Sequence, residues 1–140
     1  MAPTVFEGAD SLLSAAPRDL GCTDWVTLDQ SAISNFATAT LVAGAQDDEV
    51  APPLLVLSLT NRFLPELLEV RGVSSGVNYG SGSVRFNAPV RVGDGLRARA
   101  FLIDATEVPG GVQTTVQIRV EIEGSDEPAC IVESLSRWMR

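Results

Sequence analysis

The sequence predicts an α+β domain in which one antiparallel sheet wraps around a buried central helix. Residues 54–59 are almost entirely apolar, as expected for a helix buried on all sides. From Val70 onward, apolar and polar residues alternate, which is typical of strands. No repeat or linker interrupts the 140 residues, so we expect a single domain over residues 1–140.

The first part of the chain predicts short elements that lead into a helix. Residues 9–16 favour a short helical stretch, and residues 22–26 favour a short strand. Thr27–Gln30 has the form of a capping box, in which the Thr and Gln side chains satisfy free amides at a helix start. The helix that follows places Ile33 and Phe36 on one face at helical spacing.

A loop is expected next, followed by the central helix. Residues 41–50 lose periodicity and include the acidic trio Asp47, Asp48 and Glu49. Two prolines, at positions 52 and 53, precede the apolar segment, where a helix tolerates missing amides. Pro65 is expected to end this helix.

The remainder of the chain predicts a meander of strands separated by Gly- or Pro-containing breaks. The predicted strands cover residues 70–79, 83–88, 96–108, 112–123 and 129–139. A strand, a central helix and a long meander together describe a hot-dog fold.

The composition excludes several kinds of chemistry. The chain has no histidine and no lysine, so its 10 basic residues are all arginines, set against 18 acidic residues. Histidine-based nucleophilic triads, histidine general bases and lysine Schiff bases are therefore excluded, and we expect neither a metal nor a cofactor. The net charge of -8 argues against nucleic acid or an anionic membrane as a partner.

Two further features bear on the compartment. Cys22 and Cys130 are separate from each other and form no CxxC motif, so we expect both to be reduced thiols. No apolar stretch is long enough to span a bilayer, and no secretory signal is apparent. A cytoplasmic protein is expected.

Three stretches carry a family resemblance. Phe36–Thr40 reads Phe-Ala-Thr-Ala-Thr, residues 78–80 read Asn-Tyr-Gly, and residues 84–94 read Val-Arg-Phe-Asn-Ala-Pro-Val-Arg-Val-Gly-Asp. With these motifs the chain resembles the MaoC-like (R)-specific enoyl-CoA hydratase/dehydratase family over nearly its whole length. The resemblance implies a hot-dog fold and a homodimer, or pairing with a second hot-dog chain.

Comparison with this family also indicates that its catalytic residues are missing from the chain. Family members carry an Asp and then a His after the Phe-Ala-x-x-Thr stretch, and the two activate water and protonate a 2-enoyl thioester. Here the Asp position is Val42, and no His exists. Where the family has an amide donor near the start of the central helix, this chain has Pro52 and Pro53, which lack an N–H. Ordinary enoyl-CoA hydration is therefore not expected.

Nine residues are candidates for a site, and four of them have an alternative structural role. Asn61 either faces a cavity or satisfies nearby backbone, Tyr79 either donates to a ligand or packs with its hydroxyl at the surface, and Asp48 either points into a cleft or lies in a solvated turn. These three are the catalytic candidates. The substrate-binding candidates are Trp25, Phe36, Leu54, Leu55, Ser58 and Asn78, although Trp25 also suits the core or a dimer interface.

Three functions are compatible with these observations. The first is a cofactor-free cyclase, which folds a small apolar polyene or polyketide-derived chain into a reactive shape in an apolar pocket. The second is a non-catalytic subunit that pairs with an active hydratase chain. The third is a dehydratase that uses Asp48 as its only acid or base.

Overall fold

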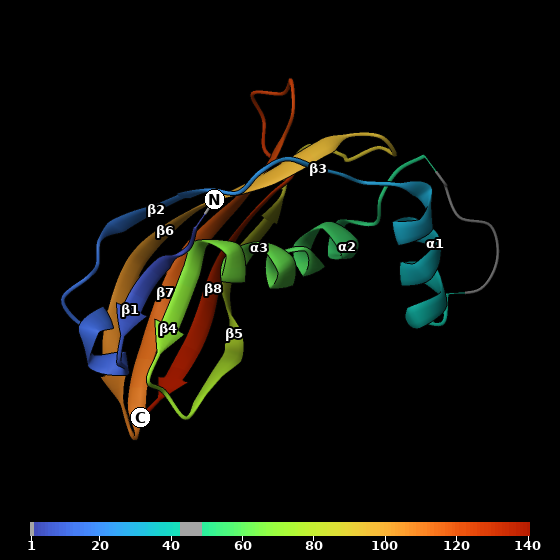
Figure 1. The fold of residues 1–140 in the computed structure, drawn as a ribbon. Helices are drawn as coiled ribbons and strands as arrows, with labels where there is room; N and C mark the ends of the chain where they lie inside the picture. The colour runs from blue at the N-terminus through green and yellow to red at the C-terminus, as the bar shows by residue number, and fades with distance from the viewer. Residues whose placement is uncertain (1, 43–48) are drawn as a thin grey trace.

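The computed structural model describes residues 2–42 and 49–140 as a curved sheet crossed by helices (Figure 1). The elements in chain order are β1 (Thr4–Glu7), η1 (Ala9–Leu12), β2 (Arg18–Cys22), β3 (Val26–Thr27), α1 (Gln30–Ala39), α2 (Pro53–Ser58), α3 (Thr60–Leu67), β4 (Leu68–Arg71), β5 (Ser75–Phe86), β6 (Gly95–Val108), β7 (Gly111–Ile122) and β8 (Cys130–Met139). This is the predicted α+β arrangement.

The main sheet has the strand order β2-β6-β7-β8-β5 with antiparallel pairing, and β3 also pairs with β6. Its inner face follows the predicted alternation, since Val116, Ile118 and Val120 of β7 are fully buried. On β6 the inner positions include the equally buried Leu96 and Leu102. A second, two-stranded sheet joins β1 and β4 in parallel.

The central helix is divided into α2 and α3 at Leu59, where one helix was expected. The Ser58 hydroxyl donates to the Leu55 carbonyl at 2.6 Å, and the Thr60 hydroxyl donates to the Leu57 carbonyl at 2.8 Å. Such side chains compete with the backbone ladder and bend helices. Pro65 lies inside α3 rather than at its end.

The central helix is buried on one side only, which corrects the expectation of a helix buried all round. Val56, Phe63 and Leu67 are buried against the body of the protein, and α3 contacts β6. On other sides of the two helices, Leu54 is 61% exposed and Asn61 is exposed. The apolar pattern indicated the helix, but it could not show how much of the helix the sheet covers.

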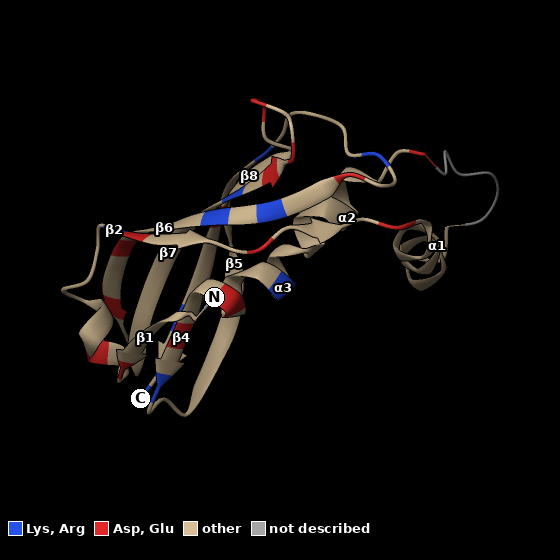
Figure 2. Cartoon of the chain, turned by 45° about the horizontal axis from the view of Figure 1, so that its top comes forward, with Lys and Arg blue, Asp and Glu red and all other residues tan. Residues whose placement is uncertain are grey.

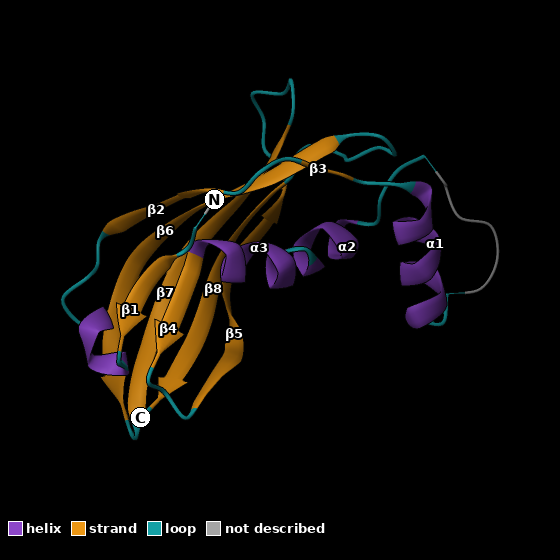
Figure 3. Ribbon diagram, viewed as in Figure 1, coloured by secondary structure: helices purple, strands orange, loops and turns teal. Residues whose placement is uncertain are grey.

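The start of α1 also differs from the expected capping box. Asp29 is the N-cap, and its carboxylate accepts from the Ala32 amide at 3.0 Å and from the Ser31 hydroxyl at 2.7 Å. These bonds, that of Ser31 first, lower the pKa of Asp29. Thr27 cannot serve as the cap because its backbone pairs with β6 as part of β3. In Figure 3, α1 lies beyond the end of α2, away from most of the sheet.

The strands expected at 70–79 and 83–88 are instead β4 and one long β5. The chain turns between them at Gly72, whose φ of 69° favours glycine. Gly80 lies at a register shift within β5 rather than at a break, because β-bulges accommodate glycine without ending the strand.

Many of the arginines form cross-strand ion pairs. Arg97 lies 2.8 Å from Glu121, and Arg99 lies 2.9 Å from Asp19. Figure 2 shows two basic bands along β6, and β2, which carries Asp19, pairs with this strand. Both pairs are partly exposed, so we expect them to contribute little to stability.

Phe63→Ala is expected to lower the free energy of unfolding by about 3–5 kcal/mol, because Phe63 is fully buried and its removal leaves a cavity. The exposed Leu54 is the matched control, and Leu54→Ala should change the free energy by less than about 0.5 kcal/mol. Urea denaturation measures both. Similar losses in the two variants would contradict the assignment of the buried face.

The two thiols are both free, as expected, and they should differ in reactivity. Burial raises the pKa of Cys130, whereas Cys22 is only half-buried. A thiol reagent at pH 8 should therefore modify one thiol per native chain rapidly, at Cys22. Two should react after denaturation. Rapid modification of both thiols in the native protein would show that Cys130 is accessible.

Candidate functional site

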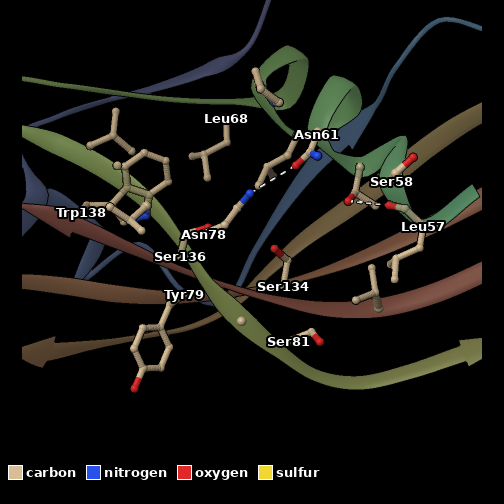
Figure 4. Close-up of a pocket in the computed structure, with 18 of the residues that line it drawn as sticks. Leu57, Ser58, Asn61, Leu68, Asn78, Tyr79, Ser81, Ser134, Ser136 and Trp138 are labelled. Carbon is tan, nitrogen blue, oxygen red and sulfur yellow. Dashed lines mark hydrogen bonds between the residues drawn. The ribbon is translucent and has the colours of Figure 1, made fainter. Parts of the chain in front are cut away.

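A pocket of about 660 Å³ lies between the central helices and the strands β5 and β8 (Figure 4). The α2 and α3 side contributes Leu57, Ser58, Asn61 and Leu64, among others, and β4 begins at Leu68 on the same wall. This volume is in the range of pockets that hold drug-sized ligands.

Small side chains on β5 and β8 create this space. Successive residues on one face of a strand are two apart, and on β8 the pocket face carries Val132, Ser134, Ser136 and Trp138. Ser134 pairs with Val116 of the neighbouring strand β7 and Ser136 with Thr114, so both serines are smaller than their fully buried partners. On β5 the lining includes glycines as well. The sheet is therefore filled tightly under β6 and β7 and left open under β5 and β8.

Trp138 is held firmly in the pocket wall. Its Nε1–H donates to the Thr114 hydroxyl at 2.9 Å, and Thr114 is fully buried. The ring lies over the backbone of Gly76, where an added Cβ would meet the ring at 2.6 Å. Gly76 thus permits the close approach, and the ring has a fixed orientation.

Two asparagine side chains meet within the pocket. The Asn78 Nδ2 group donates to Asn61 Oδ1 across 3.2 Å, which links β5 to α3 (Figure 4). Ser58 lies one helical turn from Asn61 in the sequence, but its hydroxyl already donates to the Leu55 carbonyl. On the helix side of the described pocket, the side-chain N–H group that remains available to a ligand is therefore the Asn61 amide.

The charge inside the pocket is largely neutralised. Glu69 is the carboxylate in the described lining, and it accepts from Arg71 at 2.9 Å. Across residues 2–42 and 49–140, no group of three His, Cys, Asp or Glu side chains gathers in a way that could hold a metal ion. No helix in the described ranges is long and apolar enough to cross a membrane.

Several predicted site residues do meet here. Asn61, Ser58 and Asn78 all line the pocket. Tyr79 is also a lining residue, but its ring points away from the amide pair in Figure 4. That ring is 57% exposed and lies against the Arg137 guanidinium at 3.6 Å. This placement gives the Tyr79 hydroxyl no direct access to the centre of the pocket.

Other predicted residues lie elsewhere. Trp25 is an exposed residue stacked against Arg97 at 4.4 Å, and Phe36 packs, half-buried, on the hydrophobic core. Leu55 is buried in the core and Leu54 points to solvent, so neither lines the pocket. The sequence pattern could not place these side chains, because tertiary packing decides which of them face the pocket. Asp48 lies outside the described residues.

The sequence analysis missed the β8 contribution to the site. Ser134 and Ser136 occupy inward positions of a strand whose other inward positions include the buried Val132. Small polar residues in that pattern are a signal for a cavity, because a packed sheet face normally uses larger apolar side chains. Trp138 of the same strand packs against the hydrophobic core and also lines this pocket.

The two prolines stand at the start of α2. Pro52 is the N-cap and Pro53 is the first helical residue, so neither position offers an N–H. The nearby Val56 amide donates to the Pro52 carbonyl at 3.3 Å.

Solved structures show which fold this is. A monoamine oxidase regulatory protein from Archaeoglobus matches 100% of this chain and 99% of its own, with a TM-score of 0.75 and 17% identity. An (R)-hydratase from A. caviae involved in PHA biosynthesis matches 88% of this chain and 96% of its own, with a TM-score of 0.66 and 18% identity. A chain of the ChsH1-ChsH2 complex from Mycobacterium tuberculosis matches 91% and 99%, with a TM-score of 0.65 and 15% identity. The predicted hot-dog fold is confirmed.

Comparison with proteins of similar sequence identifies the family. No protein-family model matches the chain. However, it is 37% identical over 147 residues to 3-hydroxyacyl-thioester dehydratase Z of Mycobacterium tuberculosis, covering 96% of this chain and 97% of the relative. It is also 31% identical over 128 residues to nodulation protein N of Rhizobium leguminosarum bv. viciae, covering 80% and 79%. On this identity and fold, the chain belongs to the MaoC-like (R)-specific hydratase/dehydratase family.

Proposed function

We propose that this family member acts as a cofactor-free cyclase on a polyene or polyketide-derived chain bound between α3 and the strands β5 and β8. The observation that carries the proposal is the neutral character of the described pocket wall. It offers amides from Asn61 and Asn78, hydroxyls from Ser134 and Ser136, and a Glu69 carboxylate that is already paired with Arg71.

A cycloaddition suits such a wall because the reaction transfers no proton. A diene and an alkene in one chain lose three π bonds, form two carbon–carbon σ bonds and gain one new π bond, so the product is an isomer of the substrate. Holding the reacting ends together can account for a large part of the barrier. A hydrogen bond from an Asn amide to a carbonyl conjugated with the alkene would add electrostatic stabilisation.

The lost hydratase chemistry supports the same proposal. The family's acid–base pair needs a His, and the whole sequence lacks one. The relative's printed name assigns it 3-hydroxyacyl-thioester dehydration, and we infer that this chain has kept the acyl-binding scaffold while changing the reaction. Its substrate would then be mainly apolar, consistent with the Leu64, Leu68 and Trp138 side of the pocket.

The cyclase proposal predicts acceleration of an intramolecular cycloaddition. The test substrate is a linear trienoyl thioester of N-acetylcysteamine with a four-carbon tether between the diene and the unsaturated thioester. The purified protein should raise the rate about 100-fold over buffer, equivalent to about 2.7 kcal/mol of barrier. The rate should stay flat between pH 6 and pH 8.5, because the groups in contact with the substrate do not titrate. The measurement is product formation by chromatography.

Asn61→Leu should lower that rate about 10-fold, whereas Asn35→Leu on the exposed surface of α1 should leave it unchanged. No acceleration by the parent protein would refute the cyclase proposal. A rate that rises and falls with pH would indicate acid–base chemistry instead. In that case Asp48→Asn tests the dehydratase alternative, which predicts loss of crotonyl-CoA hydration in that variant.

A second candidate function is favoured by the exposed edge of β5. This strand pairs with β8 on one side, and every described residue along it except Val84 is exposed. Its 12 residues include one charge, Arg85, so it lacks the charged side chains that usually protect an edge strand. We propose that β5 pairs with another hot-dog chain, either a second copy or an active hydratase partner.

Val77→Lys on β5 is expected to prevent this pairing, because the charge would be placed at the joined edge. Light scattering should give a mass of twice 14.8 kDa for the parent protein and 14.8 kDa for the variant. Ile103→Lys is the matched control, since Ile103 is an exposed apolar residue of β6, and it should keep the dimer. A parent mass of one chain that doubles only with a His-containing MaoC-like chain would favour the non-catalytic subunit.

A further inference from the structure

We infer that the Asn61–Asn78 amide pair is a recognition site for a substrate group that both donates and accepts hydrogen bonds, such as a hydroxyl or an unsubstituted carboxamide. This deepens the proposed function by naming a substrate class, and it rests on that proposal only in taking this pocket as the ligand site.

The geometry of the pair leaves one whole amide NH2 group and one whole carbonyl oxygen unused, in addition to the second hydrogen and second lone pair of the bonded groups. Asn78 Nδ2 donates to Asn61 Oδ1 at 3.2 Å. Within the described structure, the hydrogens on Asn61 Nδ2 and the lone pairs of Asn78 Oδ1 then have no protein partner. If both amides are turned over, the bond reverses and again leaves one donor and one acceptor. The complementarity therefore does not depend on the amide assignment.

On the helix side of the pocket, this amide pair is the best-placed group to bind a polar group of a ligand. The hydroxyls of Ser58 and Thr60 donate to helix carbonyls at 2.6 and 2.8 Å, so their hydrogens are already used. Pocket walls on either side carry apolar residues, with Trp138 and Leu68 toward one end and Leu57 toward the other (Figure 4). A ligand's chain can thus lie along apolar surface while its polar group meets the amides.

The pair also spans two elements that are fixed by other contacts. Asn61 belongs to α3, which is anchored by the fully buried Phe63. Asn78 belongs to β5, where it pairs in register with Ser136 of β8. Because both supports are fixed, a ligand meets a donor and an acceptor at set positions. Both asparagines are exposed, so an acceptor-only group gains one hydrogen bond in exchange for water, whereas a group that donates and accepts gains two.

The test compares two eight-carbon probes by isothermal titration calorimetry. Octanamide donates and accepts, whereas methyl octanoate has the same chain and only accepts. The parent protein should bind octanamide about 5- to 10-fold more tightly. Asn61→Leu and Asn78→Leu should each reduce this ratio to about 2 or less, and the surface control Asn35→Leu should retain it.

Three results would overturn the inference. They are equal binding of the two probes by the parent protein, a ratio that persists in both pocket variants, and no binding of either probe. Thermal melting of each variant separates a folding defect from loss of recognition, and Asn61→Gln and Asn78→Gln, which keep the amides, should restore part of the ratio. If the ratio behaves as expected but no cyclisation occurs, the proposed reaction fails while the recognition site stands.

Discussion

The constraint on which the site depends is the uneven filling of the space between the helices and the sheet. Under β6 and β7 the inner positions are mostly aliphatic and buried, and Phe63 of α3 is buried in the same core. Under β8 the corresponding positions include Ser134 and Ser136. Because side chains pack to a nearly constant density, residues this small leave a pocket that the helices cannot close without losing their contact with β6.

That constraint also fixes the chemistry of the wall. Trp138 is fixed at the pocket by its bond to the buried Thr114 and by the absence of a side chain on Gly76. Apart from the Glu69 carboxylate, which is paired with Arg71, the polar side chains in the described lining are amides and hydroxyls, which do not titrate over the usual pH range. A family scaffold associated with acid–base catalysis thus presents, in its described residues, a pocket suited to binding and orientation.

The fold was more predictable than the site. Strict alternation of apolar and polar residues in β7, together with the composition of its turns, predicted the strands at the C-terminal end. The residues of such a strand show directly which of its faces is buried. The apolar pattern likewise predicted the central helix. It did not predict the bend at Leu59, because that bend depends on the Ser58 and Thr60 hydroxyls and not on hydrophobicity. Asn61 stood out as a polar residue on an apolar helix, and Asn78 as part of the Asn-Tyr-Gly stretch. Four other candidates do not line the pocket, because tertiary packing decides which way their side chains face: Leu54, Leu55, Phe36 and Trp25.

The most direct test of this account fills the pocket without disturbing the rest of the fold. The measurement is the dissociation constant of cis-parinaric acid, a fluorescent linear polyene, for the parent protein, Ser134→Phe and the exposed control Ser34→Phe. Weakening of at least about 10-fold in Ser134→Phe alone, with an unchanged melting temperature, is the result predicted here. Equal affinity in all three proteins would contradict the assignment of this pocket as the binding site.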